Sequence, residues 1–369
     1  CEWFVEINEA LLQYVAIDCY QSATIGGGMV TAITANDIDS FLEGFAPFMI
    51  SLMCLAKYIN FFYNFKQMRR LLDIMREDWE IYKKLRTEYD LLCGQYAIGK
   101  KITISFVGKA LLQLAIQPDA LGLCNISDDR PLAFRVEHFV DVDRYYFPLL
   151  VHSYIGTLAY TAIVLAINSI IAVYVLHESG LCEILRFKLE NFVESDVMDV
   201  KLHANKRDDK WYQNARDCVL LHKHIIEFAN ILEDANTTSY LLQIGFSMIC
   251  VSFTQFQVAL AFRYISVTIS LLCDLLFVSW PGQQLSDSTE RIFEFTTNGK
   301  WYLSSINCRK LLMMMLSKSI TPLKLTAYKF YTLNLESFSA VRSIFYIDHS
   351  LSRHEVVPKF NDHSVLTIK

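Results

Sequence analysis

The stretch YIGTLAYTAIVLAINSIIAVYVL, residues 154–176, decides the fold class because it is long, apolar and free of charged side chains. About twenty such residues let one helix cross the hydrocarbon core of a bilayer, which is roughly 30 Å thick. The apolar run starts a few residues earlier, so we predict a membrane-spanning helix over residues 147–176. Similar runs recur along the chain, and we therefore predict an all-α membrane protein with one embedded domain.

Two further runs are long enough to cross a membrane. Residues 41–63 contain FAPFMISLMCLAKYINFFY, in which Lys57 is the only charged side chain. Residues 239–281 are apolar for about two spans and are interrupted at Arg263, which indicates a hairpin of two crossings. Three weaker candidates complete a set of seven. The predicted spans are residues 11–33, 41–63, 97–117, 147–176, 239–258, 262–281 and 325–347.

Basic side chains set the predicted orientation of these spans. The connections after the second, fourth and sixth spans are rich in Lys and Arg, whereas the connection after the third is mainly acidic. Because Lys and Arg favour the cytoplasmic side, we predict a cytoplasmic N-terminus and an extracellular C-terminus, the reverse of a G-protein-coupled receptor. The sequon at Asn125 then lies outside the cell, where it is either a glycosylation site or a chance match.

The composition argues against nucleic-acid binding and against several kinds of enzyme. The 369 residues carry a net charge of −5 and form no basic stripe interleaved with aromatic side chains. The ten cysteines form no CxxC pair, and His222 and His224 are two residues apart, so on a helix they face different sides. The sequence contains no GxSxG or HExxH motif. We predict no enzyme activity, no metal and no cofactor.

Three amphipathic segments follow predicted spans on the cytoplasmic side. Residues 68–85 and 218–234 repeat apolar side chains with a helical period and are predicted to extend membrane helices into the cytosol. The stretch LSDSTERIFEFTTNGKWY, residues 285–302, is predicted to form a separate helix that Ser286 or Asp287 caps. This helix would lead into the last span.

Ionisable and aromatic side chains at the predicted spans leave alternatives open. A charge at the bilayer centre costs at least about 2.5–3.5 kcal/mol, so Lys57 is predicted to extend its ammonium group to the inner surface. Asp274 either faces a water-filled cavity, pairs with a partner or is simply tolerated. The aromatic side chains at the outer end of the span at residues 147–176 form an interfacial belt or line an apolar ligand pocket. They are Tyr145, Tyr146, Phe147 and Tyr154.

Residues 273–341 combine several spaced elements of a known pattern. They are Gly282, Leu285, Ser288, Trp301, Arg309-Lys310, Pro322 and FYTLNLESF at residues 330–338. EHFVDVDRYYFPLLVH at residues 137–152 and REDW at residues 76–79 fit the same pattern. Together they resemble the insect odorant receptor family, and the resemblance covers residues 39–341.

The resemblance implies seven spans and a cytoplasmic N-terminus, in agreement with the orientation predicted from charge. It also implies a subunit of a ligand-gated cation channel that binds volatile odorants or pheromones and forms a heterotetramer with an obligate co-receptor. The connection after the fourth span lacks the long insertion typical of the co-receptor, so a tuning receptor is predicted. The implied location is the plasma membrane of an olfactory sensory neuron dendrite, where the receptor would act in sensory transduction.

The resemblance also implies three sets of site residues. The residues implied to bind the odorant are Tyr145, Tyr146, Phe147 and Tyr154. The residues implied to anchor subunits lie in the cytoplasmic half of a split seventh helix, about residues 285–318, and are Trp301, Leu311, Leu312 and Met315. The residues implied to line the pore lie in its outer half and are Phe330, Leu333, Asn334 and Ser337.

Two features depart from the family pattern. The embedded domain is predicted to occupy residues 1–349, and charged side chains near its end lead into a divergent tail at residues 350–369. The fifth and sixth spans are joined by almost no loop. Two other interpretations stay open: a multi-pass transporter, for which Asp274 would mark the substrate site, and a nonfunctional relative with an aberrant C-terminus.

Overall fold

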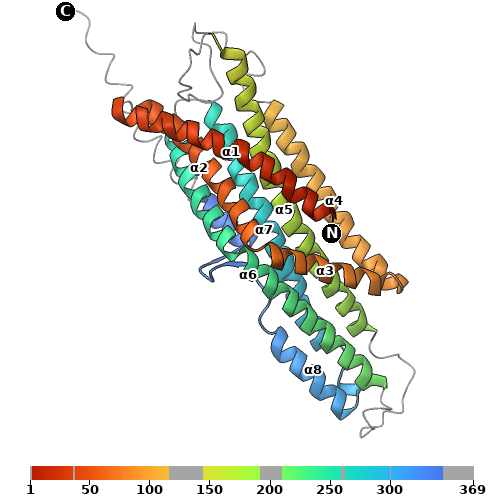
Figure 1. The fold of residues 1–369 in the computed structure, drawn as a ribbon. Helices are drawn as coiled ribbons and strands as arrows, with labels where there is room; N and C mark the ends of the chain where they lie inside the picture. The colour runs from red at the N-terminus through yellow and green to blue at the C-terminus, as the bar shows by residue number, and fades with distance from the viewer. Residues whose placement is uncertain are drawn as a thin grey trace, which may run out of the picture.

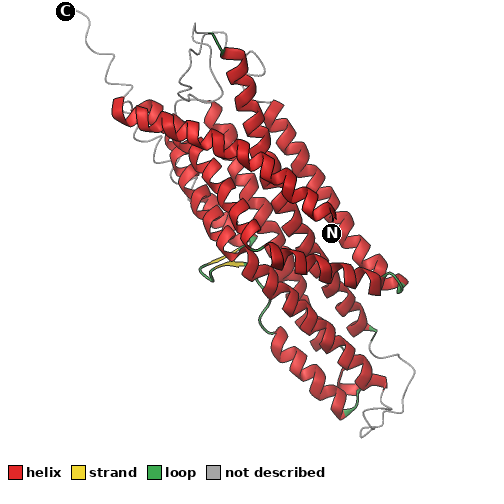
Figure 2. Ribbon diagram, in the orientation of Figure 1, coloured by secondary structure: helices red, strands yellow, loops and turns green. Residues whose placement is uncertain are grey.

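The computed structural model is an all-α bundle of long helices, and it describes residues 2–35, 38–115, 144–191, 210–258, 262–299 and 301–343. Figure 2 shows that helices make up nearly all of the described chain, apart from one small hairpin. The elements are α1 (Glu2–Ala35), α2 (Ile38–Tyr63), α3 (Phe65–Tyr82), α4 (Arg86–Ala115), α5 (Tyr146–Glu190), α6 (Lys210–Val258), α7 (Phe262–Asn298), the 3-10 helix η1 (Trp301–Leu303), α8 (Ile306–Ser319), β1 (Thr326–Ala327) and β2 (Tyr331–Thr332).

Three of these helices are much longer than a membrane crossing requires. The helices α5, α6 and α7 contain 45, 49 and 37 residues, whereas about twenty residues cross a bilayer. The predicted spans at residues 147–176, 239–258 and 262–281 lie within them, and the remaining parts gather at the end of the bundle where α8 lies (Figure 1). The long helices therefore continue from the predicted membrane region into a second packed region.

By length and composition, two helices of the described chain are apolar enough to cross a membrane. They are Gly44–Tyr63 within α2 and Tyr146–Glu190, which is all of α5. The helices that contain the other predicted spans carry more polar side chains, such as Asp18 in α1 and Asp274 in α7.

The buried apolar side chains form two clusters rather than one. The first, which we call the large core, joins α1, α2, α3, α5, α6, α7 and residues 325–341. The second, which we call the small core, joins the end of α3, the start of α4, the end of α5, the start of α6, the end of α7 and α8. Figure 1 shows α8 at the end of the bundle opposite the start of α5, so the two cores lie one after the other along the long helices.

The separate helix predicted for residues 285–302 is not present. Instead, α7 runs without a break from Phe262 to Asn298, so Ser286 and Asp287 lie in its interior and cap nothing. Asp287 accepts a hydrogen bond from Gln283 Nε2 at 2.6 Å, one helical turn away. An N-cap is needed only at the start of a helix, where the first backbone N–H groups have no acceptor within the helix. In the interior of α7 these N–H groups donate to carbonyl groups of the preceding turn. The prediction was wrong because it assumed a break near Pro281.

The chain instead turns between α7 and α8. A 3-10 turn, η1, follows the end of α7, and α8 then begins at Ile306. The side chain of Ser305 accepts a hydrogen bond from the backbone N–H of Cys308 at 3.3 Å, so Ser305 is the N-cap of α8.

The helix predicted for residues 325–347 begins later than expected. Strands β1 and β2 pair antiparallel over Thr326–Thr332, and the helix starts only at Leu335. Asn334 caps it by accepting a hydrogen bond from Ser337 N at 2.7 Å. Tyr, Thr and Phe favour strands, which explains why the aromatic, Thr-containing start of this segment forms a hairpin. The helix is described to residue 343, and the divergent tail at residues 350–369 lies outside the described residues.

Candidate functional site

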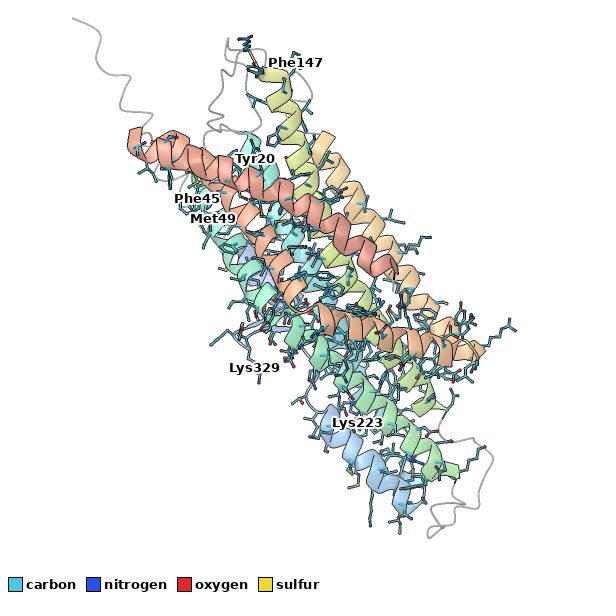
Figure 3. All side chains as sticks on the ribbon, viewed as in Figure 1. Tyr20, Phe45, Met49, Phe147, Lys223 and Lys329 are labelled. Atoms are coloured by element: carbon cyan, nitrogen blue, oxygen red, sulfur yellow. The ribbon has the colours of Figure 1, made fainter. Side chains whose placement is uncertain are left out.

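The aromatic residues predicted to bind a ligand lie at the start of α5, the end of the bundle farthest from α8 (Figure 3). The rings of Tyr146 and Phe147 meet edge to face with centroids 5.7 Å apart, and the Arg144 guanidinium lies 5.7 Å from the Tyr145 ring centroid. Phe147 is 74% exposed and Tyr145 is 43% exposed, whereas Tyr146 and Tyr154 are half-buried. The exposed pair has the position of an interfacial belt, and the half-buried pair faces partly into the protein.

Aromatic contacts between helices occur in the same half of the bundle. The rings of Tyr20 of α1 and His152 of α5 meet edge to face with centroids 5.4 Å apart. The ring centroids of Phe45 of α2 and Phe253 of α6 are 4.1 Å apart. Figure 3 places Tyr20, Phe45 and Met49 in the half of the bundle that carries Phe147. The sequence alone does not indicate these residues, because each pair is brought together only by the packing of separate helices.

A layer of buried polar contacts crosses the large core. Ser51 Oγ on α2 donates a hydrogen bond to Asp18 Oδ1 on α1 at 2.6 Å, and Lys57 Nζ on α2 donates one to Asn168 Oδ1 on α5 at 2.8 Å. Asp18 and Lys57 are each 2% exposed, so neither reaches solvent. Asp274 of α7 attracts the Lys57 ammonium group electrostatically, which supports the paired alternative for Asp274.

The prediction that Lys57 extends to the inner surface was therefore wrong. Because α2 packs against α5 and α6, the side chain of Lys57 points into the bundle, where Asn168 accepts its hydrogen bond. A buried ammonium group is retained in a membrane protein when partners on neighbouring helices compensate its lost hydration.

A second polar cluster lies where the two cores meet. His177 Nε2 of α5 and His224 Nε2 of α6 lie 2.9 and 3.0 Å from the same oxygen, Asp78 Oδ2 of α3. Since a carboxylate oxygen accepts, both imidazole nitrogens donate, and one buried carboxylate joins three helices. Burial alone would raise the pKa of Asp78, but the hydrogen bonds from His177 and His224 hold that pKa below its usual value.

The two histidines of the HKH motif differ as their spacing predicts. The hydrogen bond to Asp78 raises the pKa of His224, whereas burial lowers the pKa of His222. In the described part of the chain, no group of three His, Cys, Asp or Glu side chains is arranged to hold a metal ion. His224 is thus a structural contact of α6 with α3.

The residues predicted to anchor subunits divide into two groups. Leu312 and Met315 of α8 are 3% and 2% exposed and belong to the small core, whereas Trp301 and Leu311 are half-buried at its margin. The indole N–H of Trp301 donates to Thr297 O at 3.3 Å, which ties η1 back to α7.

The other face of α8 is apolar and exposed. Met313 and Met314, which were not among the predicted anchor residues, are 56% and 62% exposed. The run LLMMML at residues 311–316 is apolar on all sides, and this pattern is typical of a helix that is covered on more than one face.

The residues predicted to line the pore have different environments. Phe330 is 91% exposed on the hairpin, Leu333 is 3% exposed within the large core, and Ser337 is half-buried with its hydroxyl 3.2 Å from that of Thr332. Asn334 is the N-cap of the last helix. The side chains that this helix exposes over residues 335–343 are Leu335, Glu336, Ser339, Ala340, Arg342 and Ser343.

Comparisons with known proteins agree on one family and one fold. A family model described as 7tm Odorant receptor matches residues 37–346. No curated protein sequence matches the chain. The structure of the insect olfactory receptor OR5 from Machilis hrabei in complex with eugenol superimposes with a TM-score of 0.75 at 11% identity and covers 93% of this chain and 88% of that one. The structure of OR5 described without eugenol gives a TM-score of 0.74 at 11% identity, with 92% and 87% covered.

Proposed function

Since the chain belongs to the 7tm odorant receptor family, and is thus a membrane receptor of olfaction, we propose that it is the odorant-tuning subunit of a ligand-gated cation channel. The observation that carries this proposal is the family match over residues 37–346, which includes the bundle, α8 and the last helix. Family membership also favours a receptor over the transporter interpretation. The similarity to OR5 covers 93% of this chain, and this shared fold supports the proposal.

The proposed ligand is a small apolar odorant that binds within the bundle near the start of α5. OR5 is a relative of this fold that binds eugenol. In this chain the half-buried Tyr146 and Tyr154 would contact the ligand, and the exposed Tyr145 and Phe147 would lie at the membrane interface. Because apolar pockets discriminate mainly by shape, each methylene group adds only about 1 kcal/mol of selectivity.

The proposed assembly is a heterotetramer with a co-receptor, joined through α8. The exposed Met313 and Met314, together with the half-buried Leu311 and Trp301, give α8 an apolar face that water would otherwise cover. On the other side of α8, the buried Leu312 and Met315 belong to the small core, where α8 packs against α6 and α7. A large apolar surface at a fixed position is typical of subunit contacts.

The proposed pore is lined by the last helix. Its exposed face carries Glu336, Ser339 and Ala340, and this face attracts cations and offers hydroxyl groups to them. Ser337, Asn334 and Leu333 would then set the position of that helix, because they cap it or pack beside its start. Phe330, which is 91% exposed on the hairpin, has no such contact among the described residues. The channel opens if the odorant binds the open arrangement more tightly than the closed one.

The proposed location is the plasma membrane of an olfactory neuron dendrite, with the start of α5 outside the cell and α8 in the cytosol. The connections around the small core carry most of the Lys and Arg, which supports this orientation.

The proposal is tested by expressing the full chain with an odorant receptor co-receptor and recording cation current during application of an odorant panel that includes eugenol. We expect an odorant-evoked current. Surface delivery without any evoked current would support the nonfunctional interpretation, and odorant-driven uptake without channel current would support the transporter.

A matched pair of variants tests the ligand site. Tyr154→Ala removes a half-buried ring, whereas Phe147→Ala removes a ring that is 74% exposed on the same helix. We expect Tyr154→Ala to raise the half-maximal odorant concentration by roughly tenfold, or about 1.4 kcal/mol, and Phe147→Ala to leave it nearly unchanged. Equal effects of the two variants would place the ligand elsewhere.

A further inference from the structure

The hairpin formed by β1 and β2 has an unusual tip. Tyr328 and Lys329 occupy its two turn positions with φ angles of 51° and 62°, and the turn closes with a hydrogen bond from Phe330 N to Ala327 O at 3.1 Å. Such turns usually contain Asn or Gly, because other side chains are strained at positive φ. The sequence therefore keeps two large side chains at a place where small residues would fold more easily, which indicates that these side chains have a role.

The tip combines apolar and basic side chains that the protomer leaves uncovered. Phe330 is 91% exposed, Tyr328 is 50% exposed, and Lys329 is exposed between them. Figure 3 shows Lys329 projecting from the side of the bundle. Within the described residues, Lys329 and the neighbouring exposed Lys324 form no ion pair with an acidic side chain.

Hydrogen bonds hold the hairpin against α6 just before a predicted span begins at residue 239. Thr237 Oγ1 donates to Thr326 O at 3.1 Å and accepts from Tyr328 N at 2.7 Å, and the hydroxyl groups of Thr238 and Tyr328 are 3.0 Å apart. Glu233 of α6 is bound by the Thr326 hydroxyl. The hairpin therefore lies at the level where α6 would enter the membrane.

Two other predicted spans end at the same level. Asn64, directly after α2, donates to Ala235 O of α6 at 2.9 Å, so the span ending at residue 63 stops beside the hairpin's attachment. Gly282 of α7, one residue beyond the span ending at 281, faces Leu333 O so closely that a Cβ at residue 282 would lie 2.0 Å from that oxygen. Three helices thus place the hairpin at one edge of the bilayer.

We propose that residues 326–332 form a lipid-binding element that contacts the headgroup region of the cytoplasmic leaflet, with Phe330 inserted beside the acyl chains and Lys324 and Lys329 paired with anionic phospholipid headgroups. Aromatic and basic side chains are favoured at membrane interfaces, and the cytoplasmic leaflet carries the anionic lipids. This function goes beyond odorant gating and rests on the proposed membrane orientation.

The charge of the tip favours lipid over a second protein subunit. Protein interfaces are depleted of lysine in their centres, because burying an ammonium group without a partner is costly. The tip carries a lysine between two aromatic side chains, and an anionic headgroup provides its counter-charge without burying it completely.

Fluorescence quenching tests the insertion of Phe330. The full chain carrying Phe330→Trp is placed in phosphatidylcholine nanodiscs, with or without bromine on the acyl chains near the headgroup, and the unsubstituted chain is subtracted. The control is Met313→Trp, at a residue that is 56% exposed on α8. We expect bromine to quench the added emission at residue 330 and not at residue 313. Equal quenching at both positions, or none at 330, would overturn the proposal.

Lipid retention tests the basic side chains. We compare phosphatidylserine retained in native mass spectrometry by Lys324→Gln/Lys329→Gln and by the matched double variant Lys223→Gln/Lys310→Gln, whose exposed lysines lie on α6 and α8 (Lys223 in Figure 3). We expect the hairpin variant to retain fewer phosphatidylserine molecules than the control. Equal retention contradicts the proposal, and loss of oligomers with unchanged retention would show that the hairpin contacts another subunit. Neither experiment uses odorant current, so failure here leaves the receptor function standing.

Discussion

The large core and the small core share four helices, α3, α5, α6 and α7, but are held together in different ways. In the large core, buried polar groups connect the helices, as in the pairs Ser51–Asp18 and Lys57–Asn168. The small core is mainly apolar, with side chains such as Ile225 and Leu312 packed between α6 and α8. Lipid tails are as apolar as leucine, so apolar burial brings helices together in water but much less in a membrane. The difference between the cores thus indicates which part of each helix lies in lipid.

The largest expected effect comes from one substitution made in each core. Ile225 in the small core and Ile163 in the large core are both 0% exposed. Ile225→Ala is expected to destabilise the chain by about 2–5 kcal/mol, because the apolar side chain would be exposed to water on unfolding. Ile163→Ala is expected to cost less, because separated helices would keep this residue in lipid. Denaturant unfolding of both variants in nanodiscs measures the difference, and an equal or larger cost at Ile163 would contradict the assignment of the cores.

A smaller effect is expected where the hairpin segment meets α7. Gly282→Ala would drive a methyl group against Leu333 O, which is backbone and yields little, so we expect a loss of about 1–3 kcal/mol. The control is Gly245→Ala in α6, where no described heavy atom lies within 4 Å of the new Cβ. That change is expected to be neutral or slightly stabilising, since alanine favours helices. If Gly282→Ala and Gly245→Ala have the same free energy of unfolding, the close approach of residue 333 to α7 is not a feature of the folded protein.

Each single polar contact of the large core is expected to contribute less to stability than the packing contacts above. Ser51→Ala removes the hydrogen bond to Asp18 Oδ1 and is expected to cost about 0.6 kcal/mol and at most about 1.7. The matched change Ser252→Ala removes an exposed hydroxyl that bonds only within its own helix, to Met248 O, and is expected to cost almost nothing. Unfolding midpoints of the two variants decide whether contacts between helices hold this core.

The smallest expected effect is a pH dependence at the junction of the cores. The pKa of His224 is raised above its ordinary value of 6.5 by the hydrogen bond to Asp78, so its stabilising contribution is complete below 6.5 and is lost as pH rises through the folded-state pKa. Since this side chain is 36% exposed, solvent screening limits the contribution to less than about 1 kcal/mol. We expect the unsubstituted chain to lose more thermal stability between about pH 6 and pH 8 than His224→Gln does.

The control for that experiment is His222→Gln. Burial lowers the pKa of His222, so this residue destabilises the folded chain at acid pH, and its removal should leave the loss of stability at alkaline pH in place. If His222→Gln abolishes that loss and His224→Gln does not, the Asp78 cluster is not its source.

The helices formed by the long apolar runs could be predicted from the sequence, because each depends only on the continuous apolar composition of its own segment. Residues 154–176 are helical as predicted, since a charge-free segment of that length satisfies its backbone polar groups within one helix. The amphipathic helix predicted near residues 218–234 lies within α6 and extends the span at residues 239–258, as expected. The one predicted near residues 68–85 is also helical but ends at Tyr82, and it forms a separate helix, α3, instead of extending α2, which ends at Tyr63. Periodic apolar side chains predict a helix wherever they are continuous.

Features that depend on a second helix could not be predicted in this way. The direction of Lys57 is set by Asn168, more than a hundred residues later, and Asp78 is joined to His177 and His224 only by packing. The continuity of α7 through Ser286 was missed because the same residues can begin a helix or continue one. The hairpin was missed because its turn lacks the glycine or asparagine that usually marks such a turn.

The orientation of the bundle is tested most directly by epitope tags in intact and permeabilised cells. One tag precedes residue 1, and a second is inserted near Asn125, between α4 and α5. The account predicts that antibody stains the second tag in intact cells and the first only after permeabilisation. Staining of the first tag in intact cells, with the second hidden, would place the small core outside the cell and contradict the account.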